Sequence, residues 1–232
     1  MIELSLWRKN SMSTATEAPP KSRLRTLDPI LHALGGIDAS RVRMRPVPGT
    51  AKVKDAIRIN ESKEGGFVEL VDGVLVEKAM GFPEAFLAIA LSTFLKNFVD
   101  PANLGIVLGA DGMMQLFPGL LRMPDVSYFS WERLGGSVPT KAAPVIAPNL
   151  AVEVLSAGNT KKEMTRKRKE YFESGVNAVW MVDPKTRTVA VYSNPDEWVV
   201  LTENDVISGG TVLPDFSLEV RKLFGELDRT QG

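Results

Sequence analysis

Two predicted strands and a predicted helix between Arg122 and Tyr171 decide how this chain folds. The first strand lies in Met123-Pro124-Asp125-Val126-Ser127-Tyr128-Phe129, and the second is Leu150-Ala151-Val152-Glu153-Val154-Leu155-Ser156. Both runs are rich in β-branched, aliphatic and aromatic residues, a composition typical of strands. The helix contains the basic run Arg166-Lys167-Arg168-Lys169-Glu170-Tyr171. Each strand carries one acid and the helix carries a lysine, so these three side chains are candidates for a functional site.

The flanking sequence predicts further helices and strands. Apolar residues at mostly helical spacing predict a long buried helix over 82–99, followed by strands at 105–109, 113–117 and 125–129. Residues 131–149 are rich in Gly and Pro and predict a loop. The strand over 150–155 is nearly all apolar, so we expect it to be central and buried on both faces.

A helix and another strand follow this central strand. Thr160 and Glu163 fit a capping box, and Gly175 fits the helix stop. The apolar run 178–182 predicts a strand, and a strand, helix and strand in so short a span favour a right-handed parallel crossover. The order of elements predicts an α/β fold, an α+β arrangement with a mixed sheet.

Smaller elements surround this core. Asp72-Gly73 between two apolar runs predicts a tight hairpin over 67–77, and a second hairpin is expected over 187–202. Residues 212–224 are apolar and predict a strand and a short helix.

The chain divides into four predicted parts. Residues 1–25 are polar, with few large apolar residues, and are expected to be disordered. Residues 26–66 form an arm with short helices, 67–225 form the main domain, and 226–232 form a tail. Either Met1 or Met12 is the natural start, because a Ser/Thr/Pro-rich stretch opens at Met12.

Composition excludes several classes of function. The chain has no cysteine, which excludes disulfides and thiolate chemistry, and a single histidine, His32, which disfavours Ser–His–Asp hydrolases and multi-histidine metal sites. With 28 basic and 28 acidic residues the formal net charge is zero, so nucleic-acid binding would need a local basic surface. There is no secretory signal pattern at the N-terminus and no apolar run that reads as a membrane span, so we expect a soluble cytoplasmic protein without membrane contact.

Glu153 and Asp125 are the candidate metal ligands. Side chains alternate along a strand, so Glu153 places a carboxylate in an apolar central strand, where an unpaired charge is costly. Asp125 follows Pro124 at the start of a strand. Converging carboxylates repel each other unless a cation lies between them, and hard oxygen ligands favour Mg²⁺ or Mn²⁺. Glu69, in the first predicted hairpin, is either a third ligand or a solvent-facing strand residue.

Lys167 is predicted to face Glu153. It lies three residues after Met164 and four before Tyr171, on the inward stripe of its helix. Such a lysine could orient or deprotonate a water, because desolvation lowers a lysine pKa, or it could neutralise a phosphate. The alternative is a buried Lys167–Glu153 ion pair without chemistry.

Arg122, Arg166 and Lys169 are the candidate nucleic-acid contacts. Basic residues on a helix can contact a phosphate backbone, but such a run is more often a solvated helix face. For Arg122, pairing with an acid is the commoner alternative.

These residues resemble the Uma-two family of restriction endonuclease-like proteins, within the PD-(D/E)xK nuclease superfamily. The similarity extends over roughly residues 67–225. The resemblance implies a core of helix, three strands, helix and strand, with Asp125 and Glu153 as metal-binding acids. The lysine expected two residues after the glutamate is Leu155 here, and Lys167 is its natural replacement. The matching segments are Glu69-Leu70-Val71-Asp72-Gly73, Arg122-Met123-Pro124-Asp125-Val126, Ala147-Pro148-Asn149-Leu150-Ala151-Val152-Glu153-Val154-Leu155-Ser156, Lys167 to Tyr171, Gly175-Val176 and Trp180-Met181-Val182-Asp183-Pro184.

The sequence therefore predicts a Mg²⁺-dependent endonuclease that hydrolyses DNA. Asp125 and Glu153, with Glu69, would hold the metal, and Lys167 would position the water or the scissile phosphate. The main alternative is an inactive module of the same fold that binds nucleic acid or a protein partner. A hydrolase of small phosphoesters is a third hypothesis, and a homodimer is a further expectation.

Overall fold

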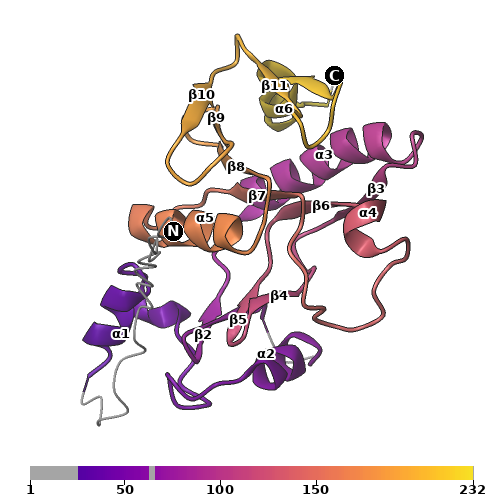
Figure 1. The fold of residues 1–232 in the computed structure, drawn as a ribbon. Helices are drawn as coiled ribbons and strands as arrows, with labels where there is room; N and C mark the ends of the chain where they lie inside the picture. The colour runs from indigo at the N-terminus through magenta and orange to yellow at the C-terminus, as the bar shows by residue number, and fades with distance from the viewer. Residues whose placement is uncertain (1–25, 63–65, 232) are drawn as a thin grey trace, which may run out of the picture.

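A six-stranded mixed sheet contains the central strand that the sequence predicts (Figure 1). The computed structural model describes residues 26–62 and 66–231. The strands lie in the order β10-β9-β8-β7-β6-β3. Their bounds are β3 Gly105–Leu108, β6 Val126–Ser130, β7 Leu150–Val154, β8 Ala178–Asp183, β9 Thr188–Tyr192 and β10 Trp198–Leu201.

Strand β7 is buried over its whole length, as predicted from its apolar composition. It pairs antiparallel with β6 and parallel with β8, with Glu153 opposite Met181. Leu150, Val152 and Val154 pack in a core cluster with α3 (Phe82–Val99), whereas Ala151 packs in a separate cluster with α5 (Lys161–Glu173). By strand alternation, Glu153 shares the face of Ala151 and points toward α5.

Helix α5 begins and ends at the predicted residues. The Thr160 hydroxyl accepts a hydrogen bond from the Glu163 amide at 3.0 Å, and the Glu163 carboxylate accepts one from the Thr160 amide at 3.3 Å. The helix ends at Glu173, and Gly175 follows with φ +96°, where a side chain would be strained. The crossover from β7 through α5 to the parallel strand β8 is confirmed.

Helix α3 is a core helix. Leu87, Leu91 and Leu95 are fully buried in the cluster under the six-stranded sheet, and burying each leucine stabilises the fold by about 1.5–3 kcal/mol. By length and composition alone, α3 is long and apolar enough to cross a membrane, the one such helix in the part of the chain that the structure describes. The sequence prediction that no run approaches a membrane span overlooked it.

A second, four-stranded sheet has the order β2-β1-β5-β4. The predicted strand at 113–117 belongs to this sheet and not to the central one, and β5 was missed because it is only three residues long. The core of helix, three strands, helix and strand is therefore α3-β3-β6-β7-α5-β8, with the β4–β5 hairpin inserted before β6. The bounds are β1 Val68–Val71, β2 Val74–Glu77, β4 Met114–Phe117 and β5 Leu120–Arg122.

The predicted hairpins and terminal elements are also present. The hairpin over 67–77 and the β9–β10 hairpin are confirmed, while α4, Trp131–Leu134, lies at the start of the predicted loop 131–149. Near the C-terminus the predicted strand and short helix are found, and β11 had not been predicted. These elements are β11 Val206–Ser208, β12 Ser217–Glu219, α6 Val220–Gly225 and η2 Glu226–Asp228.

The arm before β1 is tied to α5 by an ion pair. Arg41 donates two hydrogen bonds to the Glu163 carboxylate, at 2.8 and 2.9 Å, and one to the Gly158 carbonyl at 3.0 Å.

The predicted disorder of 1–25 lies outside the described residues, and the domain boundaries at 26, 67 and 226 stay predictions. The helices of the arm are α1 Asp28–Ala33, η1 Ala39–Arg41 and α2 Val53–Asn60.

We expect the Arg41–Glu163 pair to weaken in acid. Burial opposes the charged carboxylate, but the hydrogen bonds and charge of Arg41 lower the pKa of Glu163 below its ordinary value of 4.5. The pair therefore stabilises the fold above about pH 4.5 and is lost as the pH falls through the lowered pKa. Glu163→Gln should cost about 1–3 kcal/mol at pH 7, and less below pH 4.5, in urea unfolding. Glu173→Gln, an exposed change on the same helix, is the control, and a cost for Glu163→Gln that grows in acid would contradict the prediction.

Candidate active site

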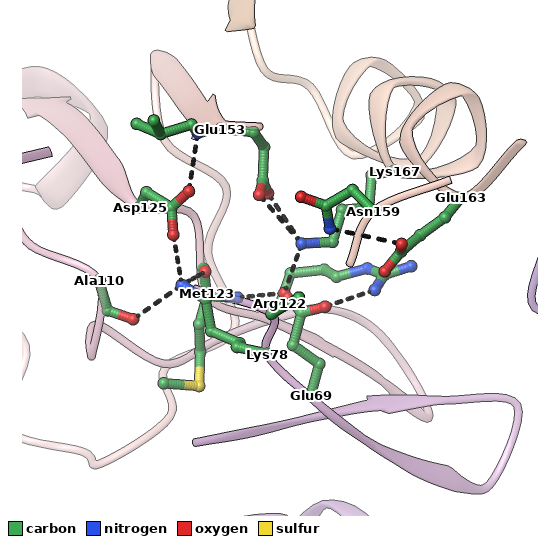
Figure 2. A network of polar contacts seen from close by, with 12 residues as sticks. Glu69, Lys78, Ala110, Arg122, Met123, Asp125, Glu153, Asn159, Glu163 and Lys167 are labelled. Atoms are coloured by element: carbon green, nitrogen blue, oxygen red, sulfur yellow. Dashed lines mark hydrogen bonds and ion pairs between the residues drawn. The ribbon is translucent and has the colours of Figure 1, made fainter. Parts of the chain in front are cut away.

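Four predicted site residues converge between the two sheets and α5 (Figure 2). Glu69 comes from β1, Asp125 from the residue before β6, Glu153 from β7 and Lys167 from α5. Their residues are 1%, 4%, 4% and 3% exposed, in that order. The structure therefore gathers these side chains into one buried polar cluster.

Lys167 pairs with two of the acids. Its amine lies 3.0 and 3.1 Å from the two Glu153 carboxylate oxygens and 3.2 Å from Oε1 of Glu69. The Tyr171 hydroxyl donates a further hydrogen bond to Glu153. Tyr171 lies one helical turn after Lys167, which explains why both side chains reach the same carboxylate.

The pKa of Lys167 shifts in the direction opposite to the one expected from the sequence. Burial opposes the charged amine, but the negative charges of Glu153 and Glu69 outweigh it and raise the pKa of Lys167 above its ordinary value. The negative charges thus hold Lys167 in its protonated form, opposite to the expected effect of desolvation, and its role toward a water or a phosphate stays a prediction. Burial raises the pKa of Glu153, with Lys167 opposing this shift and Asp125 and Glu69 adding to it.

Glu69 is an interior residue, so its interpretation as a solvent-facing strand residue is wrong. Its Oε2 lies 2.7 Å from a guanidinium nitrogen of Arg122, and its Oε1 accepts a hydrogen bond from the Met123 amide at 3.1 Å. Burial acts to raise the pKa of Glu69, but the charges of Lys167, Arg122 and Lys78 lower it to about 2. Glu69 is therefore a permanent anion in this cluster.

The predicted nucleic-acid contacts lie in different environments. Arg122 is 3% exposed and pairs with Glu69 and Glu170, so the acid-pairing alternative describes its geometry. Arg166 is partly buried and pairs with Glu170 at 2.7 Å and with Asp72 at 2.8 Å. Lys169 is exposed on α5. Contact with a nucleic acid stays a prediction for these residues, and Lys169 is the one placed at the surface.

Lys78 also belongs to the cluster, although the sequence did not reveal it. Its amine lies 2.8 Å from Oδ1 of Asp125 and donates hydrogen bonds to the Met123 and Ala110 carbonyls at 2.6 and 3.1 Å (Figure 2). Oδ2 of Asp125 accepts a hydrogen bond from the Val154 amide at 2.7 Å. Strand alternation gives a signal for it. Val76 is the cross-strand partner of Glu69, and Lys78 lies two residues after Val76, so its side chain points to the same side as Glu69.

The arrangement does not fit a divalent cation. Carboxylates and carbonyls are the ligand types that Mg²⁺ prefers. However, every carboxylate already has partners. Asp125 pairs with Lys78, Glu153 contacts Lys167 and Tyr171, and Glu69 pairs with Arg122 and Lys167. Within 26–62 and 66–231, no group of three or more acidic, His or Cys side chains is placed to hold a metal. The three carboxylates therefore already face buried cations, and one of these, Arg122, pairs with Glu170 as well.

Comparison with known proteins identifies the family. The model of the Uma2 family, described as "Putative restriction endonuclease", matches residues 55–221, well over half of the chain. The chain belongs to the Uma2 family. The sequence resemblance is thereby confirmed.

A solved structure agrees with the fold of this Uma2 protein. The crystal structure of a "putative nuclease belonging to DUF820" from Anabaena variabilis ATCC 29413 matches with a TM-score of 0.66 and 20% sequence identity. The match covers 76% of this chain and 98% of that chain. No match was found among curated proteins. The nuclease-like mixed α and β fold is therefore confirmed.

A double-mutant cycle should show strong coupling between Lys167 and Glu153. Lys167→Met or Glu153→Gln alone leaves an uncompensated buried charge, which costs about 3–5 kcal/mol. The double variant should cost clearly less than the sum of the two single changes, as measured by urea unfolding at pH 7. Strictly additive costs would show that the two side chains are not paired in solution.

Proposed function

We propose that this Uma2 protein is a metal-dependent endonuclease that hydrolyses phosphodiester bonds of DNA. The observation that carries the proposal is the convergence of Asp125, Glu153 and Lys167 in one buried cluster. The family and the fold of the DUF820 protein support nuclease chemistry. The requirement for Mg²⁺ or Mn²⁺ enters the proposal from the sequence prediction alone, because each carboxylate of the cluster is paired with a buried cation in the structure.

The side chains of the cluster suit distinct tasks in phosphodiester hydrolysis. Lys167 is a fixed positive charge that would stabilise the negative charge developing on the phosphate. Asp125 and Glu153 keep the role that the sequence predicts for them, the acids that would hold a metal ion. Tyr171 would hold Glu153 in place through its hydrogen bond.

We propose that DNA approaches beside the two short segments that follow β2 and β7. The Ser156 hydroxyl donates a hydrogen bond to the Ala79 carbonyl at 3.2 Å, which joins the segment after β7 to the segment after β2. Met80 and Phe82, beside Ala79, are 36% and 87% exposed. We place phosphate entry between these segments, which must separate because the cluster side chains are nearly inaccessible.

Helix α5 offers the local basic surface that a neutral chain needs for DNA binding. Lys161, Lys162 and Lys169 are exposed, and Lys162 and Lys169 lie seven residues apart, on one helical face. Arg168 instead stacks on Tyr192 at 4.4 Å from the ring centre. The prediction of Lys169 as a phosphate contact therefore enters the proposal, whereas the buried Arg122 does not.

One observation favours a second function, a catalytically inactive module that binds nucleic acid or a protein partner. Each acid of the cluster is already paired with a buried cation, as a purely structural network requires. Such a module would bind DNA without cutting it.

The predicted homodimer also stays a proposal. Its best candidate surface is edge strand β10, where Trp198, Val199 and Val200 are more than half exposed.

Plasmid nicking in Mn²⁺ tests the nuclease assignment. Asp125→Asn, Glu153→Gln and Lys167→Met should each lower the nicking rate by about a hundredfold or more, because each removes a charge at the reacting group. Lys222→Glu, an exposed change on α6, should leave the rate unchanged. Nicking by folded Asp125→Asn protein at the wild-type rate would exclude this cluster as the active site, and DNA binding without nicking by the wild type would favour the inactive module.

Charge removal at Lys169 should weaken DNA binding without changing its sequence preference. Lys169→Ala removes one phosphate contact, so the dependence of log Kd on log salt should fall by about one, as measured by fluorescence anisotropy on a duplex. Lys222→Ala is the matched control. Equal affinity and equal salt dependence for wild type and Lys169→Ala would remove Lys169 from the DNA surface.

A further inference from the structure

Arg168 on α5 and two aromatic residues of β9 and β10 form a stack of planar groups (Figure 1). The guanidinium carbon of Arg168 lies 4.4 Å from the ring centre of Tyr192. Trp198 is the cross-strand partner of Tyr192, and the two ring centres lie 5.7 Å apart with their planes at 29°. Together, Arg168, Tyr192 and Trp198 are the aromatic platform.

The aromatic platform is open to solvent at its β10 end. Tyr192 is 7% exposed, whereas Trp198 is 55% exposed, and Val200 on the same face of β10 is 52% exposed. Covering an indole ring removes a large apolar area from water, and a further planar group can stack on it. Because the indole is already held against Tyr192, little side-chain freedom is lost when such a group binds.

The cation of the platform has no acidic partner in the part of the chain that the structure describes. Arg166, the other arginine of α5, pairs with Glu170 and Asp72. Arg168 forms no such pair there, and its Nε atom is buried without a hydrogen-bond partner. Lys161, seven residues before Arg168, is exposed on the same side of the helix. This side of α5 therefore complements a negatively charged ligand.

We infer that the aromatic platform binds an unpaired nucleotide of DNA, with the base stacked on Trp198 and a phosphate at Arg168. A planar apolar face beside an unneutralised cation matches a nucleotide, which combines a flat base with an anion. A base inside a duplex is already covered on both faces, so the ligand is a single-stranded segment or a base displaced from the duplex. The inference deepens the proposed function and rests on it for DNA as the substrate.

The platform lies on the face of the central sheet that carries the polar cluster. Through the strand registers, Glu153 on β7 and Val200 on β10 lie in one row, and Trp198 shares the face of Val200. Three strand spacings, about 14 Å, separate β7 from β10. Because α5 packs over β7 and β8 on this face, the DNA would cross the exposed side of the helix, which carries Lys169. One strand of DNA can therefore reach from the cluster to the platform.

A second copy of the chain is the competing occupant of this surface, because β10 is an edge strand. Pairing along that edge would satisfy the backbone groups of β10. It would not by itself supply an anion to Arg168, whereas each nucleotide carries one. The charge of the platform thus favours nucleic acid, and the two occupants make different predictions.

Fluorescence anisotropy of a labelled short oligothymidylate, recorded on the full-length protein in EDTA, tests the inference. Trp198→Ala removes the stacking surface, so it should weaken binding about tenfold, and Trp198→Phe should retain most of the affinity. Ile89→Ala, an exposed apolar change on α3, should leave the affinity unchanged. On an abasic strand of equal length, Trp198→Ala and the wild type should bind equally, because no base is present to stack.

Arg168 should act through the phosphate and not through the base. Arg168→Gln should weaken the binding of oligothymidylate and of the abasic strand alike. It should also lower the dependence of log Kd on log salt by about 0.7, the value for one phosphate of a single strand. Arg168→Lys, which keeps the charge, should keep the salt dependence of the wild type.

The wild type alone already makes the inference falsifiable, since it should bind oligothymidylate at least about tenfold more tightly than the abasic strand. Equal affinity for the two strands, or equal affinity of wild type and Trp198→Ala for oligothymidylate, would overturn the inference. A wild-type dimer that Trp198→Ala converts to monomer, with oligothymidylate affinity unchanged, would assign the surface to a second copy and overturn it too. The proposed function fails separately: Trp198-dependent binding without nicking in Mn²⁺ would retain the platform and reject the nuclease.

Discussion

The burial of the Glu153 carboxylate on β7 is the constraint on which the rest of the site depends. A charge in the middle of the central strand is tolerated only with partners, and Lys167 and Tyr171 supply them from α5. Both partners reach Glu153 because the parallel crossover places α5 over the face of the strand that carries Ala151 and Glu153. The capped start of α5 thus contributes to the geometry of the polar cluster.

The second sheet completes the neutralisation of this charge. Strand β1 pairs with β5, with Leu70 opposite Leu121, and this pairing brings Glu69 and Arg122 to the same end of the cluster. Lys78 follows from the partner strand β2 and closes the network on Asp125. The two sheets are therefore joined by a chain of ion pairs, in addition to the apolar cluster that both sheets share. Loss of one member leaves its neighbours unpaired, which explains why stability and function are expected to be coupled here.

Local patterns in the sequence predicted the parts of the site that regular elements carry. Strand alternation predicted that Glu153 is buried, and helical spacing predicted that Lys167 faces it, because both patterns depend only on neighbouring residues. Lys78 was missed because the pairing of Val76 with Glu69, which places Lys78 on the side of the cluster, becomes known only with the register of the hairpin. The direction of the pKa shift of Lys167 was also beyond local reasoning, since it depends on Glu69, which arrives from a distant strand. The separation of β4 from the central sheet required the pairing of β5 with β1.

The central claim is that the cluster of Asp125, Glu153 and Lys167 is the active site of a nuclease. Crystals grown with Mn²⁺ and a phosphorothioate DNA duplex would test it directly through anomalous scattering at the manganese edge. The account predicts a DNA phosphate beside the Lys167 amine and one strong anomalous peak within bonding distance of the Asp125 and Glu153 carboxylates. A peak elsewhere on the chain, or bound DNA with neither phosphate nor manganese beside these side chains, would contradict the account.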